Sequence, residues 1–114
     1  GHLDLMDYLT DHGASRPVPL DTLTKLIGLP GKVGVDGKDV GPLIHAGMLE
    51  QVHAYCLCDV VQTAGLFLRV QLLRGLLDRD QYRAAMEVLL QWMRDDERLR
   101  AVYDGVNQDL LLLR

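Results

Sequence analysis

Tyr55-Cys56-Leu57-Cys58-Asp59-Val60-Val61-Gln62-Thr63, continuing through Leu66-Phe67-Leu68-Arg69, is the stretch that decides the fold. Its apolar residues recur at helical spacing and predict one long helix, from about Met48 to Leu77. At helical periodicity, one arc of roughly 140° collects the residues Leu49, Val52, Cys56, Val60, Leu66, Phe67, Val70 and Leu73. We expect this arc to face the core.

Asp59 falls inside the predicted arc, and Tyr55 lies at its edge, one turn earlier on the same face. A carboxylate at a core-facing position is costly unless something compensates its charge. The usual compensators are a hydrogen-bond network, a salt bridge or a metal ion, and the spacing alone does not choose among them.

The bulk composition indicates one domain with an aliphatic core, because the 114 residues are 48% hydrophobic and only 5% aromatic. The net charge of −4 argues against a general basic surface for nucleic acid, although metal-dependent nuclease sites are themselves acidic. We find neither an uninterrupted apolar membrane span nor a signal peptide. Cys56 and Cys58 are too few for a disulfide framework, which favours a reducing, cytoplasmic location. We expect Cys56 to be buried and Cys58 to be more exposed.

The remaining segments predict a mainly α chain. Leu3–Leu9 reads either as a short strand, near residues 3–7, or as the start of a helix. Asp21 is expected to cap a short helix that Gly28 and Pro30 end, and one or two helical turns are expected within Val40–Ala46. Two amphipathic helices follow, with inner faces formed by Tyr82, Ala85, Met86, Leu89 and Met93, and by Leu99, Val102, Tyr103, Val106, Leu110 and Leu113.

Some individual residues carry narrower expectations. Asp80 should cap the first of these two helices. The leucine run 110–113 either docks on the core or packs on a second copy, and we favour docking. Arg69 and Arg74 are expected at the surface, and the histidines at 12, 45 and 53 form no spaced metal set.

An ordered set of motifs resembles a known family. The set comprises His2-Leu3-Asp4-Leu5-Met6-Asp7, Leu26-Ile27-Gly28-Leu29-Pro30-Gly31-Lys32, Asp36-Gly37-Lys38-Asp39-Val40, Ala46-Gly47 and the Tyr55/Asp59 helix. Residues 2 to about 77 resemble the C-terminal half of predicted 3'-5' exonucleases similar to the proofreading domain of family B DNA polymerases. That family belongs to the ribonuclease H-like superfamily.

The resemblance implies a two-metal phosphodiesterase that uses Mg²⁺ or Mn²⁺ on single-stranded or frayed 3' ends of DNA. It implies that Asp59 is a metal ligand and that Tyr55 orients the attacking water. It also implies that this chain is the helical half of an α/β ribonuclease H-like fold. Residues 1–77 would then be the C-terminal portion of the exonuclease-like domain, and residues 78–114 a helical extension of the same unit.

The chain also departs from the family. Such exonucleases open with a strand that bears Asp-x-Glu, whereas the only match here, Asp95-Asp96-Glu97, lies near the other end in a charged helical stretch. We interpret it as solvated surface. We therefore expect a fragment that is inactive alone, with Lys32 and Lys38 as candidate contacts to the phosphate backbone. The alternative is a small helical module for protein interaction, or for homodimerisation through exposed apolar helices.

Overall fold

The computed structural model describes residues 20–32 and 40–114, and these residues form helices and connecting turns without a strand. The mainly α prediction is therefore confirmed for this part of the chain. The expected short strand at residues 3–7 lies outside the described residues. The helices are α2 (Leu20–Leu26), α3 (Val40–His45), α4 (Leu49–Leu73), α5 (Arg79–Asp95), the 3₁₀ turn η2 (Glu97–Leu99), α6 (Arg100–Gly105) and α7 (Gln108–Leu111).

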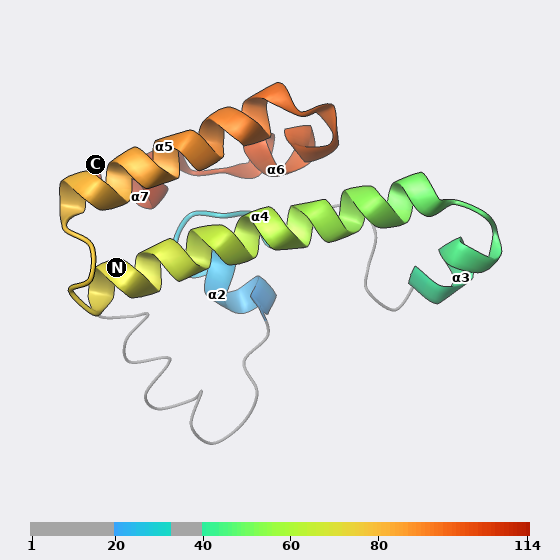
Figure 1. The fold of residues 1–114 in the computed structure, drawn as a ribbon, viewed down its shortest axis with the longest axis horizontal. Coiled ribbons are helices and arrows are strands. Elements are labelled where there is room, and N and C mark those ends of the chain that lie inside the picture. The colour runs from blue at the N-terminus through green and yellow to red at the C-terminus, as the bar shows by residue number, and fades with distance from the viewer. Residues whose placement is uncertain (1–19, 33–39) are drawn as a thin grey trace, which may run out of the picture.

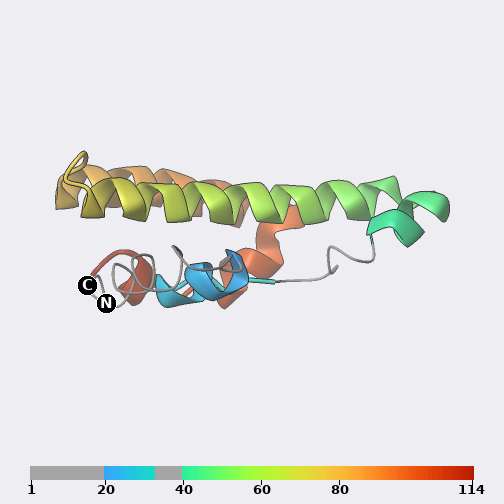
Figure 2. The ribbon, with the colours of Figure 1, turned by 90° about the horizontal axis from the view of Figure 1, so that it is seen from below.

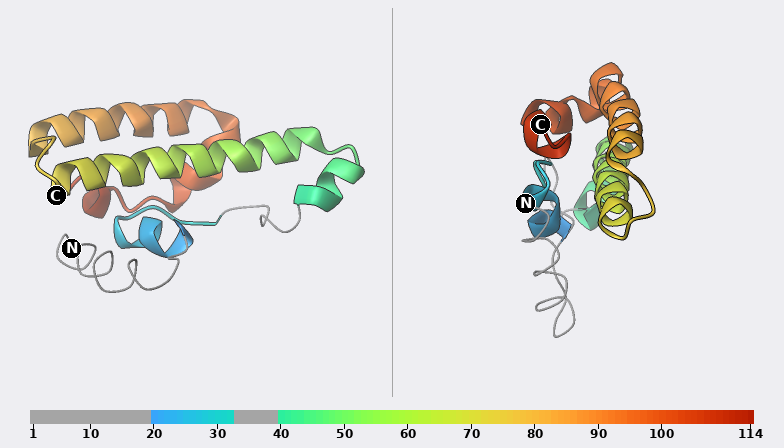
Figure 3. Two further views of the ribbon diagram at one scale, coloured as in Figure 1. Left: turned by 60° about the horizontal axis from the view of Figure 1, so that its bottom comes forward. Right: turned by 90° about the vertical axis from the view of Figure 1, so that its left-hand side faces the viewer.

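The helices form two layers. α4 and α5 run antiparallel beside each other as one layer (Figure 1), while α2, α6 and α7 lie across one face of that pair (Figure 2). Both layers are visible end-on in Figure 3. At about 1.5 Å per residue, the 25 residues of α4 give a rod of about 37 Å, and the other elements dock along it.

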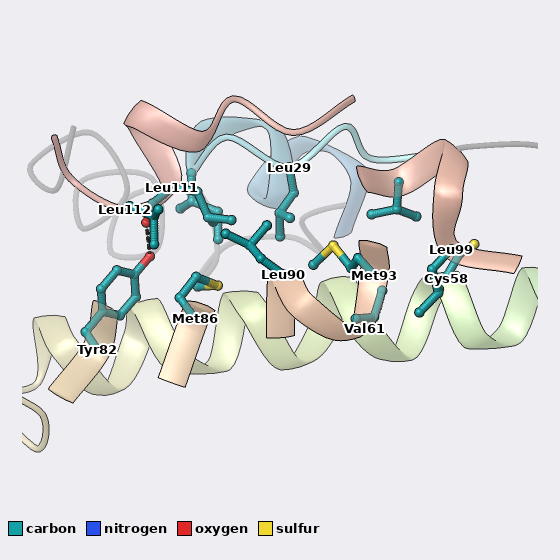
Figure 4. Packing of buried hydrophobic residues seen from close by; sticks show 12 residues of the cluster. Leu29, Cys58, Val61, Tyr82, Met86, Leu90, Met93, Leu99, Leu111 and Leu112 are labelled. Carbon is teal, nitrogen blue, oxygen red and sulfur yellow. Dashed lines mark hydrogen bonds between the residues drawn. The ribbon is translucent and has the colours of Figure 1, made fainter. Parts of the chain in front are cut away.

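The core lies between the layers, where side chains from both meet (Figure 4). It is mostly aliphatic and sulfur-containing, as the composition predicted. Its buried members are Ile27, Leu29, Cys58, Val61, Tyr82, Met86, Leu90, Met93, Leu99, Val102, Leu111 and Leu112.

The predicted core face of α4 is only partly correct: Val52 is buried, and Leu66 and Leu73 pack against the core. Leu49, Cys56, Val60 and Phe67 are exposed, whereas the buried positions of the helix are Val52, Cys58, Val61, Gln62, Gly65 and Arg69. The cysteine assignment is reversed as well, with Cys58 buried and Cys56 exposed. Both errors share one cause: α4 is apolar on two faces, and the face that packs inward carries a glutamine and an arginine, which a hydrophobicity pattern scores as outward.

By length and composition α4 could cross a membrane, a property that the core helix of a folded domain can share. Here α4 packs along the polar helix α5 and bonds the second layer through Gln62 and Arg69. These contacts account for α4 as the central helix of the described fold.

The start of α5 has a different cap from the one predicted. Asp78, rather than Asp80, is the N-cap: its carboxylate accepts from the Gln81 amide at 2.7 Å, and the Gln81 side chain accepts from the Asp78 amide at 2.9 Å. This reciprocal pair satisfies two backbone donors at the start of the helix. The predicted inner face of α5 is confirmed at Tyr82, Met86 and Met93, which are buried.

Asp21 also differs from its predicted role. α2 begins one residue earlier, and Asp21 lies in its first turn. Its carboxylate accepts from the Lys32 amide at 2.6 Å and pairs with Lys25 at 3.1 Å. The hydrogen bond from Lys32, followed by that from Lys25, lowers the pKa of Asp21 below its usual value. Asp21 therefore ties the segment after α2 back onto the helix.

The predicted helix between Leu99 and Leu113 is broken into η2, α6 and α7. α6 ends at Gly105, and the Asn107 side chain then caps α7 by accepting from the Leu110 amide at 3.1 Å. The break turns the final segment back toward α2, where the Asn107 amide donates to the Gly28 carbonyl at 2.8 Å.

The C-terminal leucines dock on the core, as favoured from the sequence, with Leu111 and Leu112 buried. The Arg69 guanidinium, which was expected at the surface, is fully buried and donates to the carbonyls of Leu110 at 3.0 Å and Leu111 at 3.3 Å. From α5, Arg83 donates to the carbonyls of residues 112 and 113. Two arginines thus bind the successive backbone carbonyls of residues 110–113 at the end of α7, where few carbonyls have a partner within the helix.

Candidate functional site

Tyr55 and Asp59 lie one turn apart on α4, as the sequence predicted, but in a different environment. Asp59 is exposed and Tyr55 is half-buried. A solvated carboxylate needs no compensating charge, so the argument from burial no longer supports a cation at Asp59. The exposed position does leave the Asp59 carboxylate accessible to a ligand.

Thr63 bonds within the helix. Its hydroxyl donates to the Asp59 carbonyl at 2.7 Å, the common back-bond from a threonine to the preceding turn. Because its hydroxyl is used within the helix, we assign Thr63 no role in chemistry at Asp59.

The residues in the described ranges do not by themselves form a metal site. Within residues 20–32 and 40–114 there is no group of three or more His, Cys, Asp or Glu side chains arranged to hold an ion. His45 and His53 are exposed and join no such group. Asp59 can provide one carboxylate ligand, whereas a two-metal centre requires several.

In the stretch Asp95-Asp96-Glu97, Asp95 and Glu97 are exposed, in keeping with the interpretation as surface, whereas Asp96 is half-buried and has a structural role. Asp96 caps η2 by accepting from the Arg98 amide at 3.0 Å, and the Arg98 guanidinium donates to the same carboxylate at 2.8 Å. The bonds from Arg98 lower the pKa of Asp96 to about 2. Asp96 and Arg98 thereby stabilise the turn that follows α5.

Cys58 has no features of a reactive thiol. It is buried, and its Sγ donates to the Arg98 carbonyl at 3.5 Å. Burial, and secondly the charge of Asp96, raise the pKa of Cys58, which disfavours the thiolate that nucleophilic or metal-binding chemistry needs.

The segment after α2 lies against α4 close to Asp59. Gln62, three residues after Asp59 and almost fully buried, accepts from the Gly31 amide at 2.9 Å and donates to the Gly31 carbonyl at 2.6 Å. This two-way bond positions exposed Lys32 beside the same stretch of helix. Lys38 lies outside the described residues. Gln62 was not predicted to matter, because α4 carries three glutamines, Gln51, Gln62 and Gln71, and nothing local marks Gln62 as the one with a buried contact.

Comparison with known proteins gives one family. Residues 1–106 match the family described as predicted 3'-5' exonucleases related to the exonuclease domain of PolB. No curated protein and no solved structure matches the chain. Because the family match spans most of the 114 residues, the chain belongs to the predicted 3'-5' exonucleases related to the PolB exonuclease domain.

Proposed function

We propose that this chain provides Asp59 as a metal ligand, and Tyr55 as the residue that orients water, in a divalent-metal-dependent 3'-5' exonuclease. The substrate would be a single-stranded or frayed 3' end of DNA. The family match over residues 1–106 is the observation that carries the proposal. The one-turn spacing of the two side chains and the exposure of the carboxylate support it.

Other carboxylates must complete the site, since the described residues supply only one ligand there. We place them elsewhere in a longer ribonuclease H-like domain, which would bind Mg²⁺ or Mn²⁺. Residues 1–77 would form the C-terminal portion of this domain, and residues 78–114 would extend the same unit. The packing of α5, α6 and α7 into one core with α4 supports the second assignment.

The roles proposed for the neighbouring side chains follow from their position. The Tyr55 hydroxyl, one turn before the carboxylate, is within reach of a water molecule held at the site. Lys32 and Lys38 would contact the phosphate backbone of the strand that enters. The Gln62 bonds to Gly31 support this role for Lys32, because they fix its segment beside α4. The free cysteines fit a reducing, cytoplasmic compartment.

The test is degradation of end-labelled single-stranded DNA with Mn²⁺, using the longer exonuclease domain that we propose, with this chain as its C-terminal portion. Asp59→Asn should lower the rate by about a hundredfold or more, because a ligand to the catalytic ions is lost. Asp104→Asn, also an exposed aspartate, should leave the rate unchanged. The 114-residue chain alone should be inactive. Equal rates for Asp59→Asn and the unmodified protein would refute the proposal for Asp59.

One observation favours a second candidate function, a helical interaction module. α4 exposes Val60 and Phe67 on a face that no described element covers. This property does not require nuclease activity and can be examined by itself.

A further inference from the structure

The exposed side of α4 carries a regular stripe of residues. Starting at Leu49, successive members follow at alternating steps of four and three, and we call them the α4 seam: Leu49, His53, Cys56, Val60, Thr63, Phe67, Val70 and Arg74. Val70 is half-buried and the others are exposed. The exposed fractions of Val60 and Phe67, 56% and 59%, are large for apolar side chains at the middle of a central helix.

Alternating steps of three and four are the spacing with which one helix packs against another helix. Such a stripe stays in register with a partner helix along its length, because it repeats every 3.5 residues on average. The inner face of α4 already contacts α2 and α5, so this outer seam is a second packing face. Its geometry therefore favours a helix as the occupant.

The charges at the two ends of the seam indicate which kind of partner helix would pair with it. Glu50 is exposed in the first turn of α4, and Arg74 is exposed at its C-cap. In an antiparallel pair of identical helices, each glutamate lies near the arginine of the other copy. The two helix dipoles then point in opposite directions, which is also favourable. A parallel pair would bring like charges together at both ends.

We propose that two copies of this chain associate through antiparallel pairing of their α4 seams. In the register that opposes Leu49 and Arg74, Cys56 faces Phe67 of the second copy, and Val60 faces its Thr63. Asp59 lies beside the seam rather than in it, at the edge of the paired helices. The proposal is therefore independent of the nuclease function and stands or falls without it.

The first test is sedimentation equilibrium of the full chain at micromolar concentration. The unmodified chain should be a dimer, and Phe67→Asp should weaken association by at least about tenfold, since it introduces a charge at the apolar seam. Leu76→Asp is the matched control, because Leu76 is also 59% exposed but lies beyond the end of α4. It should leave the dissociation constant unchanged, and circular dichroism should show unaltered helix content in both variants.

The second test distinguishes antiparallel self-pairing from non-specific apolar adhesion. Glu50→Arg and Arg74→Glu should each weaken the dimer, because each substitution places like charges opposite each other at both ends of the pair. The double variant should restore association, since the charges are complementary again. A monomeric unmodified chain would overturn the proposal and leave the seam to another partner, such as the rest of an exonuclease domain. Equal weakening by Leu76→Asp, or a double variant no stronger than the single ones, would also overturn it.

Discussion

Tyr82 is the residue that most directly joins the two layers. It lies on α5, fully buried, and its hydroxyl donates to the Leu111 carbonyl at 2.6 Å (Figure 4). The same hydroxyl accepts from Arg69 Nε at 3.0 Å. Within the described residues, Arg69 Nη1 is buried without a hydrogen-bond partner. The arginine therefore depends on Tyr82 and the C-terminal carbonyls to offset the cost of its burial.

Tyr82→Phe should lower the free energy of unfolding by about 1–3 kcal/mol, because it leaves Arg69 Nε without its acceptor in the core. Urea unfolding at neutral pH measures the change. Tyr103→Phe is the control: Tyr103 is half-buried, and among the described residues its hydroxyl accepts one hydrogen bond, from Gln108 at 3.3 Å. A smaller loss for Tyr82→Phe than for Tyr103→Phe would contradict this account of the network.

The same substitution should alter stability at alkaline pH. Burial raises the pKa of the Tyr82 phenol, against the smaller opposing effect of Arg69. Above about pH 10, the unfolded chain therefore loses this proton before the folded chain does, and stability falls as pH rises. Tyr82→Phe should remove that part of the decline. An identical slope in both proteins would show that other groups cause it.

Single residues also mark how far the sequence could predict the site. The spacing of Tyr55 and Asp59 and their family were accessible from the motifs, since i and i+4 share a helix face whatever surrounds it. The environment of Asp59 could not be predicted from the motifs, because its burial depends on which face of α4 meets the other helices. Gln62 and Arg69 decide that face through bonds to distant backbone atoms, and no local pattern encodes them.

At the scale of elements, local signals predicted helices better than their boundaries. Asp78 and Asp80 are equally good cap residues in composition, and the choice of Asp78 follows from its reciprocal bonds with Gln81. The final helix is broken because Gly105 lies against the Pro30 ring and Asn107 caps a new turn. The contact of Gly105 with Pro30 and the bond from the Asn107 amide to the Gly28 carbonyl join distant segments, whereas periodicity alone continued the helix to Leu113.

The cap of α5 gives a prediction at this scale. Asp78→Ala should destabilise the protein by about 1 kcal/mol, because the carboxylate that binds the Gln81 amide is lost. Asp80→Ala, one residue into the helix, should cost only a few tenths of that amount through the helix dipole. Urea unfolding of both variants checks the order. A larger effect at Asp80 would mean that the cap assignment is wrong.

At the scale of the molecule, stability depends on the contact between α2 and the C-terminal segment within the second layer. Gly28 sits at this contact with a positive φ of 102°, and its carbonyl accepts from the Asn107 amide. A Cβ at Gly28 would lie 2.8 Å from the Asn107 carbonyl oxygen and 3.0 Å from the Leu111 amide nitrogen. Both neighbours are backbone atoms, so relief would require the C-terminal segment to move.

Gly28→Ala should therefore lower the free energy of unfolding by more than the left-handed backbone conformation alone accounts for. Gly75→Ala is the matched control, because Gly75 also has a positive φ, 77°, but open space around its Cβ position. The control should lose about 1–2 kcal/mol, and Gly28→Ala should lose about 1–3 kcal/mol more through overpacking. If the two layers unfold together, urea curves followed by Trp92 fluorescence on α5 and by circular dichroism should shift in parallel. A Trp92 transition that stays in place while the circular dichroism curve shifts would show that the α4–α5 layer folds independently of the C-terminal segment.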